Sequence, residues 1–284
     1  MHDNSVPASA AARRKVEIGG ISVYLAHPDE LPLNWIGQPE LVLQLHACWR
    51  LIDERDIPLT PRLIGKPGVG KTTLAYAAAK MLKREVYIFQ ATMDTRPEDL
   101  LITPVIGDDR RITYVASSVV TAMITGGVAI LDEGNRMSER SWASLAPLLD
   151  TRRYIESIVA GVKVSAHPEF RMVATMNDDA STFEIPEYIH SRLQPQIFLD
   201  FPEREEELAI LRENLPFVDE KILNYVADFL EKSHAADEPF TVRDGINIAR
   251  YVAKRLKMKP TDLQALLTEA LLKVLGESAL RYVR

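Results

Sequence analysis

The sequence predicts an α/β protein, in which a five-stranded parallel sheet is covered by helices on both faces and is followed by a small all-α domain. Short apolar runs bounded by turn-forming residues alternate with helical segments, and these runs cover residues 62–64, 85–89, 127–131, 170–175 and 196–199. After Pro202, apolar residues recur at the three- and four-residue spacings of helices, as at Ile222, Val226, Phe229 and Leu230.

The amino-terminal region carries a hairpin pattern in front of this core. Residues 1–14 are rich in alanine and serine and show no periodicity, so they predict a loose tail. Apolar residues on both sides of Gly19-Gly20 predict two short strands joined by a tight turn. Thr241 and Thr261 are expected to cap helices of the last region. The predicted regions are a tail and hairpin, an α/β core and a helical lid domain, over residues 1–30, 31–202 and 203–284.

The composition of the 284 residues is that of an ordinary globular protein. Hydrophobic residues make up 46% and charged residues 26%, which excludes a mainly disordered chain. No apolar run approaches the roughly 20 residues that cross a bilayer, and no signal peptide is evident, so we expect no membrane insertion. The single cysteine, Cys48, excludes an internal disulfide and fits a reducing, cytoplasmic location. The net charge of −6 argues against a surface devoted to nucleic acid.

A glycine-rich loop between the first core strand and an alanine-rich helix, predicted over residues 72–82, matches the phosphate-loop pattern. Glycines let backbone N–H groups curl around phosphate oxygens, and the helix N-terminus adds partial positive charge. We expect Lys71 to reach the β- and γ-phosphates of ATP, and the Thr72 hydroxyl to bind Mg²⁺. The strand–loop–helix context disfavours the alternative, an ordinary glycine-rich turn. The predicted nucleotide-binding residues are Gly65-Lys66-Pro67-Gly68-Val69-Gly70-Lys71-Thr72 and Thr73.

Two adjacent carboxylates follow the apolar run that ends at Leu131. Open α/β sheets place ligands at the carboxyl ends of their strands, where Asp132 and Glu133 are expected. Asp132 suits Mg²⁺ coordination, and Glu133 suits the polarisation of a water that attacks the γ-phosphate. A strand that simply ends in a polar turn is the alternative. The phosphate loop upstream favours the catalytic interpretation.

With these two elements, the chain resembles the AAA+ ATPases, and among them the MoxR-like family, over residues 34–270. It departs from the family's pattern at Gly134, Asp178 and Ser191, so the resemblance is to the broader MoxR-like group. The other segments that carry the resemblance, in the family's order, are Gly37-Gln38-Pro39-Glu40, Phe89-Gln90-Ala91-Thr92, Pro97-Glu98-Asp99-Leu100, Leu131-Asp132-Glu133-Gly134-Asn135-Arg136, Val173-Ala174-Thr175-Met176-Asn177, Ile185-Pro186-Glu187 through Ser191-Arg192, and Thr241-Val242-Arg243.

The resemblance implies roles for four more residues. Gln38 would help to hold the adenine, and Asn177, as sensor 1, would orient the attacking water. Arg192 would be the arginine finger that reaches a neighbouring subunit's nucleotide, and Arg243 would be sensor 2 on the lid. Each has a simpler alternative: Asn177 caps a loop, Arg192 is a solvated surface residue, and Arg243 pairs with Asp244.

The resemblance also implies two hairpin insertions, which in the family point toward the axis of a ring. One covers residues 102–117, with Asp108-Asp109 at its turn. The other covers residues 154–166, with Ala160-Gly161 at its turn. No role is assigned to Arg136, Arg152 and Arg153.

The function implied is that of a ring-forming ATPase that couples ATP hydrolysis to remodelling or chaperone-like activation of a client protein or metalloprotein complex. The ring would be a hexamer with ATP and Mg²⁺ as cofactors. A separate von Willebrand factor A domain protein is the expected type of partner, since the chain contains no Asp-x-Ser-x-Ser motif. A nucleic-acid motor or loader and a small phosphate-loop kinase are the alternatives.

Overall fold

The computed structural model describes residues 14–32, 34–106, 110–178, 184–259 and 261–283. The predicted tail, except for Arg14, and the predicted turn at Asp108-Asp109 therefore lie outside the described residues. Within them, no helix is long and apolar enough to cross a membrane.

The core contains the predicted parallel sheet of five strands. Its spatial order is β11-β3-β10-β7-β4, and every neighbouring pair is parallel. The order places β3, β10 and β7 side by side, so the residues at their carboxyl ends meet at one edge. The strands are β3 Arg62–Gly65, β4 Val86–Gln90, β7 Val128–Asp132, β10 Arg171–Asn177 and β11 Gln196–Phe198.

Helices cover both faces of this sheet, as predicted. Helices α1 and α2 pack on one face around Leu63 and Ile130, whereas α3 and α4 pack on the other around Leu131 and Met176. Helix α2 begins and ends one residue earlier than predicted. The core helices are α1 Pro39–Trp49, α2 Lys71–Met81, α3 Ser118–Thr125, α4 Glu139–Leu145 and α5 Glu187–His190, with 3₁₀ turns η1 Pro97–Leu100 and η2 Gly134–Arg136.

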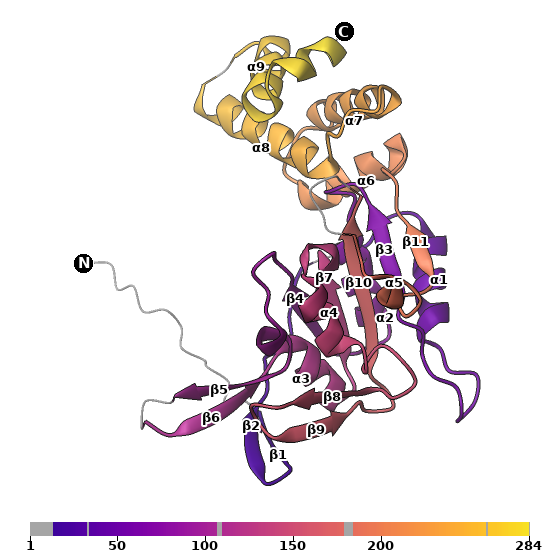
Figure 1. Cartoon of the computed structure of the whole chain (residues 1–284). Helices are drawn as coiled ribbons and strands as arrows, with labels where there is room; N and C mark the ends of the chain where they lie inside the picture. The colour runs from indigo at the N-terminus through magenta and orange to yellow at the C-terminus, as the bar shows by residue number, and fades with distance from the viewer. Residues whose placement is uncertain (1–13, 33, 107–109, 179–183, 260, 284) are drawn as a thin grey trace.

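Three hairpins lie at the end of the core away from the lid (Figure 1). All three coincide with the predicted hairpins. The sequence did not predict that two of them join: β2 pairs with β6 in parallel, with Val23 opposite Tyr114, to give a four-stranded sheet ordered β1-β2-β6-β5. The strands are β1 Lys15–Ile18, β2 Ile21–Tyr24, β5 Ile102–Ile106, β6 Ile112–Ala116, β8 Tyr154–Ser157 and β9 Val162–Ser165.

The carboxy-terminal region is helical and has its own hydrophobic core. Thr241 caps α8 as predicted, with its hydroxyl accepting from the N–H of Asp244. The prediction of Thr261 as a cap is wrong, because the neighbouring Asp262 accepts the N–H of Ala265 instead. The elements are α6 Arg204–Asn214, α7 Glu220–Ala235, α8 Val242–Met258, α9 Leu263–Leu275 and the 3₁₀ helix η3 Glu277–Tyr282.

Candidate active site

The glycine-rich loop joins β3 to α2, as the phosphate-loop pattern requires. Gly68 and Gly70 have φ of 83° and 96°, a left-handed conformation that favours glycine. The ammonium of Lys71 donates to the carbonyls of Gly65 and Lys66, both at 2.8 Å. The lysine side chain therefore folds back over the loop from the start of α2, and it is only 6% exposed.

The lid touches this loop directly. A Cβ on Gly68 would lie 2.5 Å from Cγ2 of Thr241, the capping residue of α8. A Cβ on Gly70 would lie 3.2 Å from the ring of Trp35. Any larger residue at Gly68 would therefore strain the loop and displace the N-terminus of α8.

A cavity of about 520 Å³ lies between the loop, the segment before α1 and the lid. Gln38 reaches the lid here: its backbone N–H donates to Oε1 of Glu206 at 2.9 Å. The indole Nε1 of Trp35 is buried and has no hydrogen-bond partner among the described residues. The cavity brings together predicted site residues from three distant parts of the chain. They line it with Trp35 and are Gln38, the loop and helix residues Gly68, Val69, Gly70 and Thr73, and Arg243.

Asp132 lies beside the phosphate loop, at the carboxyl end of β7. Its Oδ1 accepts from the hydroxyl of Thr72 at 2.6 Å and from the hydroxyl of Thr175 at 2.5 Å. The Thr175 oxygen also accepts the backbone N–H of Glu133 at 3.0 Å. Thr175 thus fixes both carboxylate residues to the neighbouring strand β10.

The carboxylate of Glu133 is held from two sides. Nδ2 of Asn177 lies 3.3 Å from Oε1, and Nε of Arg136 lies 2.6 Å from Oε2. Asn135 in turn fixes Asn177, because its amide donates to the Asn177 carbonyl at 2.8 Å. Glu133 itself has φ of 53°, which turns the chain sharply into η2.

Sequence reasoning missed three residues of this site: Thr175, Asn135 and Arg136. The signal for Thr175 was its place two residues before Asn177 on the same strand. For Asn135 and Arg136, the signal was the turn directly after Glu133.

Arg192 lies apart from the residues around the phosphate loop. Its guanidinium contacts Oδ2 of Asp150 at 3.4 Å and the carbonyl of Tyr188. The pKa of Asp150 is lowered to about 2, mainly by the Arg152 guanidinium and less strongly by Arg192. Of the two other arginines without an assigned role, Arg152 pairs with Asp150, and Arg153 donates to the carbonyl of Phe170 at 3.1 Å.

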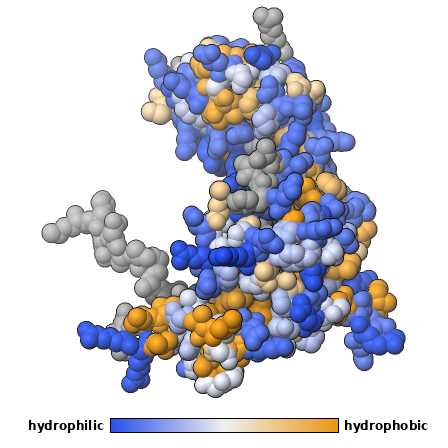
Figure 2. All heavy atoms as spheres, in the orientation of Figure 1, coloured by the Kyte–Doolittle hydropathy of each residue, from blue (hydrophilic) through white to orange (hydrophobic). Residues whose placement is uncertain are grey.

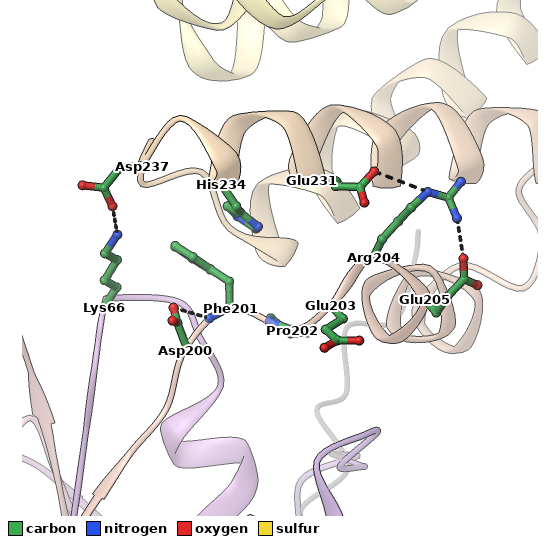
Figure 3. A pocket seen from close by; sticks show the side chains of 10 residues that line it. All are labelled: Lys66, Asp200, Phe201, Pro202, Glu203, Arg204, Glu205, Glu231, His234 and Asp237. Atoms are coloured by element: carbon green, nitrogen blue, oxygen red, sulfur yellow. Dashed lines mark hydrogen bonds and ion pairs between the residues drawn. The ribbon is translucent and has the colours of Figure 1, made fainter.

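Figure 3 shows how the strand-to-lid segment packs against α7. The rings of Phe201 and His234 stack with centroids 3.9 Å apart. Above Phe201, the ammonium of Lys66 pairs with Asp237 at 2.6 Å. Lys66 of the phosphate loop therefore points to the lid rather than to the cavity that Gln38 and Arg243 line.

Behind this contact lies a buried carboxyl group. Glu207 is fully buried, and neither of its oxygens has a hydrogen-bond partner among the described residues. Burial, with a smaller effect of the Glu231 charge, raises its pKa to about 8. Nδ1 of His234 lies 3.5 Å from Oε1 of Glu207, and burial lowers the pKa of that histidine. Both groups are therefore neutral at neutral pH.

The strand order and the phosphate loop define the AAA+ P-loop fold, and this chain has it. Residues 62–193 match the family profile described as the AAA domain of the dynein-related subfamily. The match begins with β3 and includes the phosphate loop, Asp132, Glu133 and Asn177.

Proteins similar in sequence to this chain include the following two. The chain is 27% identical over 214 residues to mouse von Willebrand factor A domain-containing protein 8. The aligned region covers 68% of this chain and 11% of that protein. It is also 25% identical over 174 residues to an uncharacterised protein of Staphylococcus epidermidis. That aligned region covers 60% of this chain and 66% of that protein. The chain thus spans only part of each relative.

Solved structures of RuvB from Thermotoga maritima have a similar fold. The structure described as the RuvB Holliday junction branch migration motor superposes with a TM-score of 0.57 at 16% identity, over 86% of this chain and 72% of that chain. At this identity the likeness concerns the fold alone.

Proposed function

We propose that the protein is a MoxR-like AAA+ ATPase that hydrolyses ATP in a ring and uses the energy to remodel a client protein. The observation that carries this proposal is the convergence of Lys71, Thr72, Asp132, Glu133 and Asn177 at the carboxyl ends of three adjacent strands. This is the set of groups that phosphoryl transfer to water requires.

The phosphate loop and the cavity beside it bind the nucleotide in this proposal. Lys71 exchanges its two carbonyl contacts for phosphate oxygens, and the loop N–H groups donate to the same phosphates. The base enters the cavity of Trp35 and Gln38, and Arg243 follows the phosphates from the lid. Lid and core therefore both contact one ligand.

Thr72 and Asp132 fit a magnesium ion, because Mg²⁺ prefers a few oxygen ligands and completes its shell with phosphates and water. Their oxygens already lie 2.6 Å apart. Among the described residues, no group of three or more His, Cys, Asp and Glu side chains could hold a metal ion by itself. Bound Mg²⁺ would neutralise charge on the β- and γ-phosphates.

Glu133 acts as the general base in this scheme. Its carboxylate takes the proton of the water that attacks the γ-phosphate, and Asn177 orients that water. Asn135 and Arg136 fix the position of these two groups. The site thus has an acceptor for the proton and a rigid support for it.

The position of Arg192 supports a ring. In one subunit its contacts are with Asp150 and Tyr188, away from the phosphate loop, so it serves as an arginine finger only on a neighbouring subunit's nucleotide. We propose a hexamer by analogy with the family that the sequence resembles.

The hairpins are the surface that we assign to the client. Figure 2 shows hydrophobic side chains gathered at the lower end of the molecule, over the hairpins. Ile106, Ile112 and Ile158 at the hairpin ends are 76%, 65% and 90% exposed. Exposed apolar groups of this kind favour contact with protein. The likeness to a von Willebrand factor A domain protein supports a partner that carries such a domain.

A nucleic-acid motor is the second candidate, suggested by the likeness in fold to RuvB. The net charge of −6 and the apolar hairpin ends disfavour it. Salt-dependent binding to single- or double-stranded DNA would support it against the protein-remodelling function. Phosphate release from ATP without an added acceptor would exclude the third candidate, a kinase.

The test of the proposed function compares the wild-type protein with Lys71→Ala. We expect ATP-dependent phosphate release and a larger sedimenting species with ATP for the wild type, and neither for the variant. Lys80→Ala, on the exposed end of the same helix, is the matched control and should behave as wild type. Equal phosphate release by Lys71→Ala would overturn the assignment of the site.

A further inference from the structure

Arg62, the first residue of β3, is a buried guanidinium. It is 3% exposed, and its Nε and Nη1 have no hydrogen-bond partner among the described residues. Burial lowers the pKa of Arg62, because a charge removed from water without a partner is costly. A charge buried in this way is costly to the fold unless a partner or a ligand compensates it.

The neighbouring strand provides a comparison within the same chain. Arg171, the first residue of β10, is also buried, at 6% exposure. Its Nε donates to the carbonyl of Trp49 at 2.6 Å, and its Nη1 donates to the carbonyls of Pro168 and Phe170, both at 2.9 Å. The fold therefore satisfies the Arg171 guanidinium with its own backbone, whereas two nitrogens of Arg62 have no partner in the part of the chain that the structure describes.

Arg62 lines a cavity of about 510 Å³ on the α5 side of the sheet. Ile64 and Met176 line it, as does His190 of α5. At the carboxyl end of the strands, Asn135 and Asn177 line the same cavity. These two residues also support Glu133, so the cavity adjoins the candidate catalytic group.

We infer that this cavity is a second anion site, in which Arg62 binds a small oxyanion of the phosphate type. The planar guanidinium matches two oxygens of such an ion, and the amides of Asn135 and Asn177 offer further donors. Inorganic phosphate is the oxyanion that ATP hydrolysis would release, and Asn177, which lines the cavity, also contacts the proposed general base Glu133. The idea that ATP hydrolysis supplies the phosphate rests on the proposed function, whereas the anion site itself does not depend on it.

Two exposed carboxylates also line the cavity, Asp178 and Glu184. They repel a bound anion, so binding is weak and release is easy, as a product on its way out of an active site requires.

The first experiment measures thermal unfolding of the whole chain against inorganic phosphate, at ionic strength held constant with chloride. The wild-type Tm should rise with phosphate and saturate. Arg62→Leu should lose this response, and Arg62→Gln should weaken the apparent affinity by roughly tenfold or more, the worth of a charge-assisted contact. A wild-type Tm that does not depend on phosphate, or an equal response in Arg62→Leu, overturns the proposal.

The phosphate loop is itself an anion site, so Lys71→Ala is the second arm. The rise of Tm with phosphate should persist in Lys71→Ala. If Lys71→Ala loses this rise and Arg62→Leu keeps it, the phosphate binds at the loop and the proposal is overturned. This arm requires no ATPase activity. Failure of the proposed function would show as absent ATP binding, with the phosphate response intact.

A stability comparison separates Arg62 from an ordinary structural arginine. In phosphate-free buffer, Arg62→Leu should keep or raise the Tm, because the substitution removes an unpaired buried charge. Arg171→Leu should lower the Tm, because it removes the guanidinium that donates to the carbonyls of Trp49 and Pro168. If Arg62→Leu lowers the Tm as much as Arg171→Leu, Arg62 is a structural residue and the site is overturned.

Discussion

Arg136 Nε lies 2.6 Å from Oε2 of Glu133, across the 3₁₀ turn that directly follows β7. Both side chains are 31% exposed, so the pair is accessible to ligands but shielded on most sides. The proposed general base is thus anchored by a cation three residues further along the chain. This contact leads to the first two predictions.

Replacing the base itself should separate binding from hydrolysis. Glu133→Gln should keep ATP affinity, because the phosphate loop is intact, and should lose about a hundredfold or more in turnover, because an amide does not accept the proton. ATP binding and steady-state phosphate release measure the two effects. Glu139→Gln, exposed at the start of α4, is the control. Undiminished turnover in Glu133→Gln would refute the role of Glu133.

Removing the anchor should have a smaller effect of the same kind. Arg136→Gln should lower kcat by about tenfold with little change in KM, because Glu133 loses one of its two supports and samples unproductive positions. Arg140→Gln, exposed on the following helix, controls for the loss of a charge. A kcat equal to or above that of the wild type would show that the pair does not assist hydrolysis.

The arginine finger can be tested by mixing two inactive proteins. Arg192→Ala should lose about a thousandfold in turnover while it still binds ATP, and Lys71→Ala should be inactive because it does not bind ATP. Mixed together, they form interfaces with one intact loop and one intact finger, so activity should return in part and rise with protein concentration. Arg152→Ala, which removes the other arginine on Asp150, should stay active. Near wild-type hydrolysis by Arg192→Ala alone would contradict a role in trans.

Trp35 should report nucleotide binding through its fluorescence. It lines the cavity beside the phosphate loop, whereas Trp49 and Trp142 are 2% and 0% exposed in the core. ATP should therefore change the emission of the wild type but not that of Trp35→Phe. A change of equal size in Trp35→Phe would mean that the nucleotide binds elsewhere or acts on the core.

The buried carboxyl of Glu207 should make stability depend on pH. Its pKa of about 8 in the folded chain lies above the ordinary value of 4.5, so the unfolded chain gives up a proton that the folded chain keeps. Stability should therefore fall as the pH rises from about 4.5 to about 8. Glu207→Gln should remove this dependence. The difference between the Tm of Glu207→Gln and that of the wild type should therefore grow in favour of the variant as the pH rises over that range. Exposed Glu205→Gln should show no such trend. A constant difference between Glu207→Gln and wild type would refute the shift.

Much of this architecture could be predicted because its signals are local. Apolar runs bounded by breakers predicted the strands, and the glycine pattern predicted the loop with its positive φ at Gly68 and Gly70. The contacts that the prediction missed join segments distant in sequence. Thr175 reaches Asp132 because β10 and β7 are neighbours, and two nitrogens of the Arg62 guanidinium lack a partner among the described residues because of what packs around them. Single-sequence patterns carry no information about such encounters.

The parallel pairing of β2 with β6 has a mechanical consequence. A two-stranded ribbon alone is flexible and marginally stable, whereas four hydrogen-bonded strands resist bending. The insertion hairpin is therefore an arm stiffened near its base, where Val23 and Tyr24 of the amino-terminal hairpin pair with Tyr114 and Val115. Its base joins η1 and α3, so a small rotation of these elements would swing the far end through a larger arc. An arm of this kind would turn a small rotation of η1 and α3 into a larger movement of its far end, and truncating residues 15–24 should make the arm more flexible.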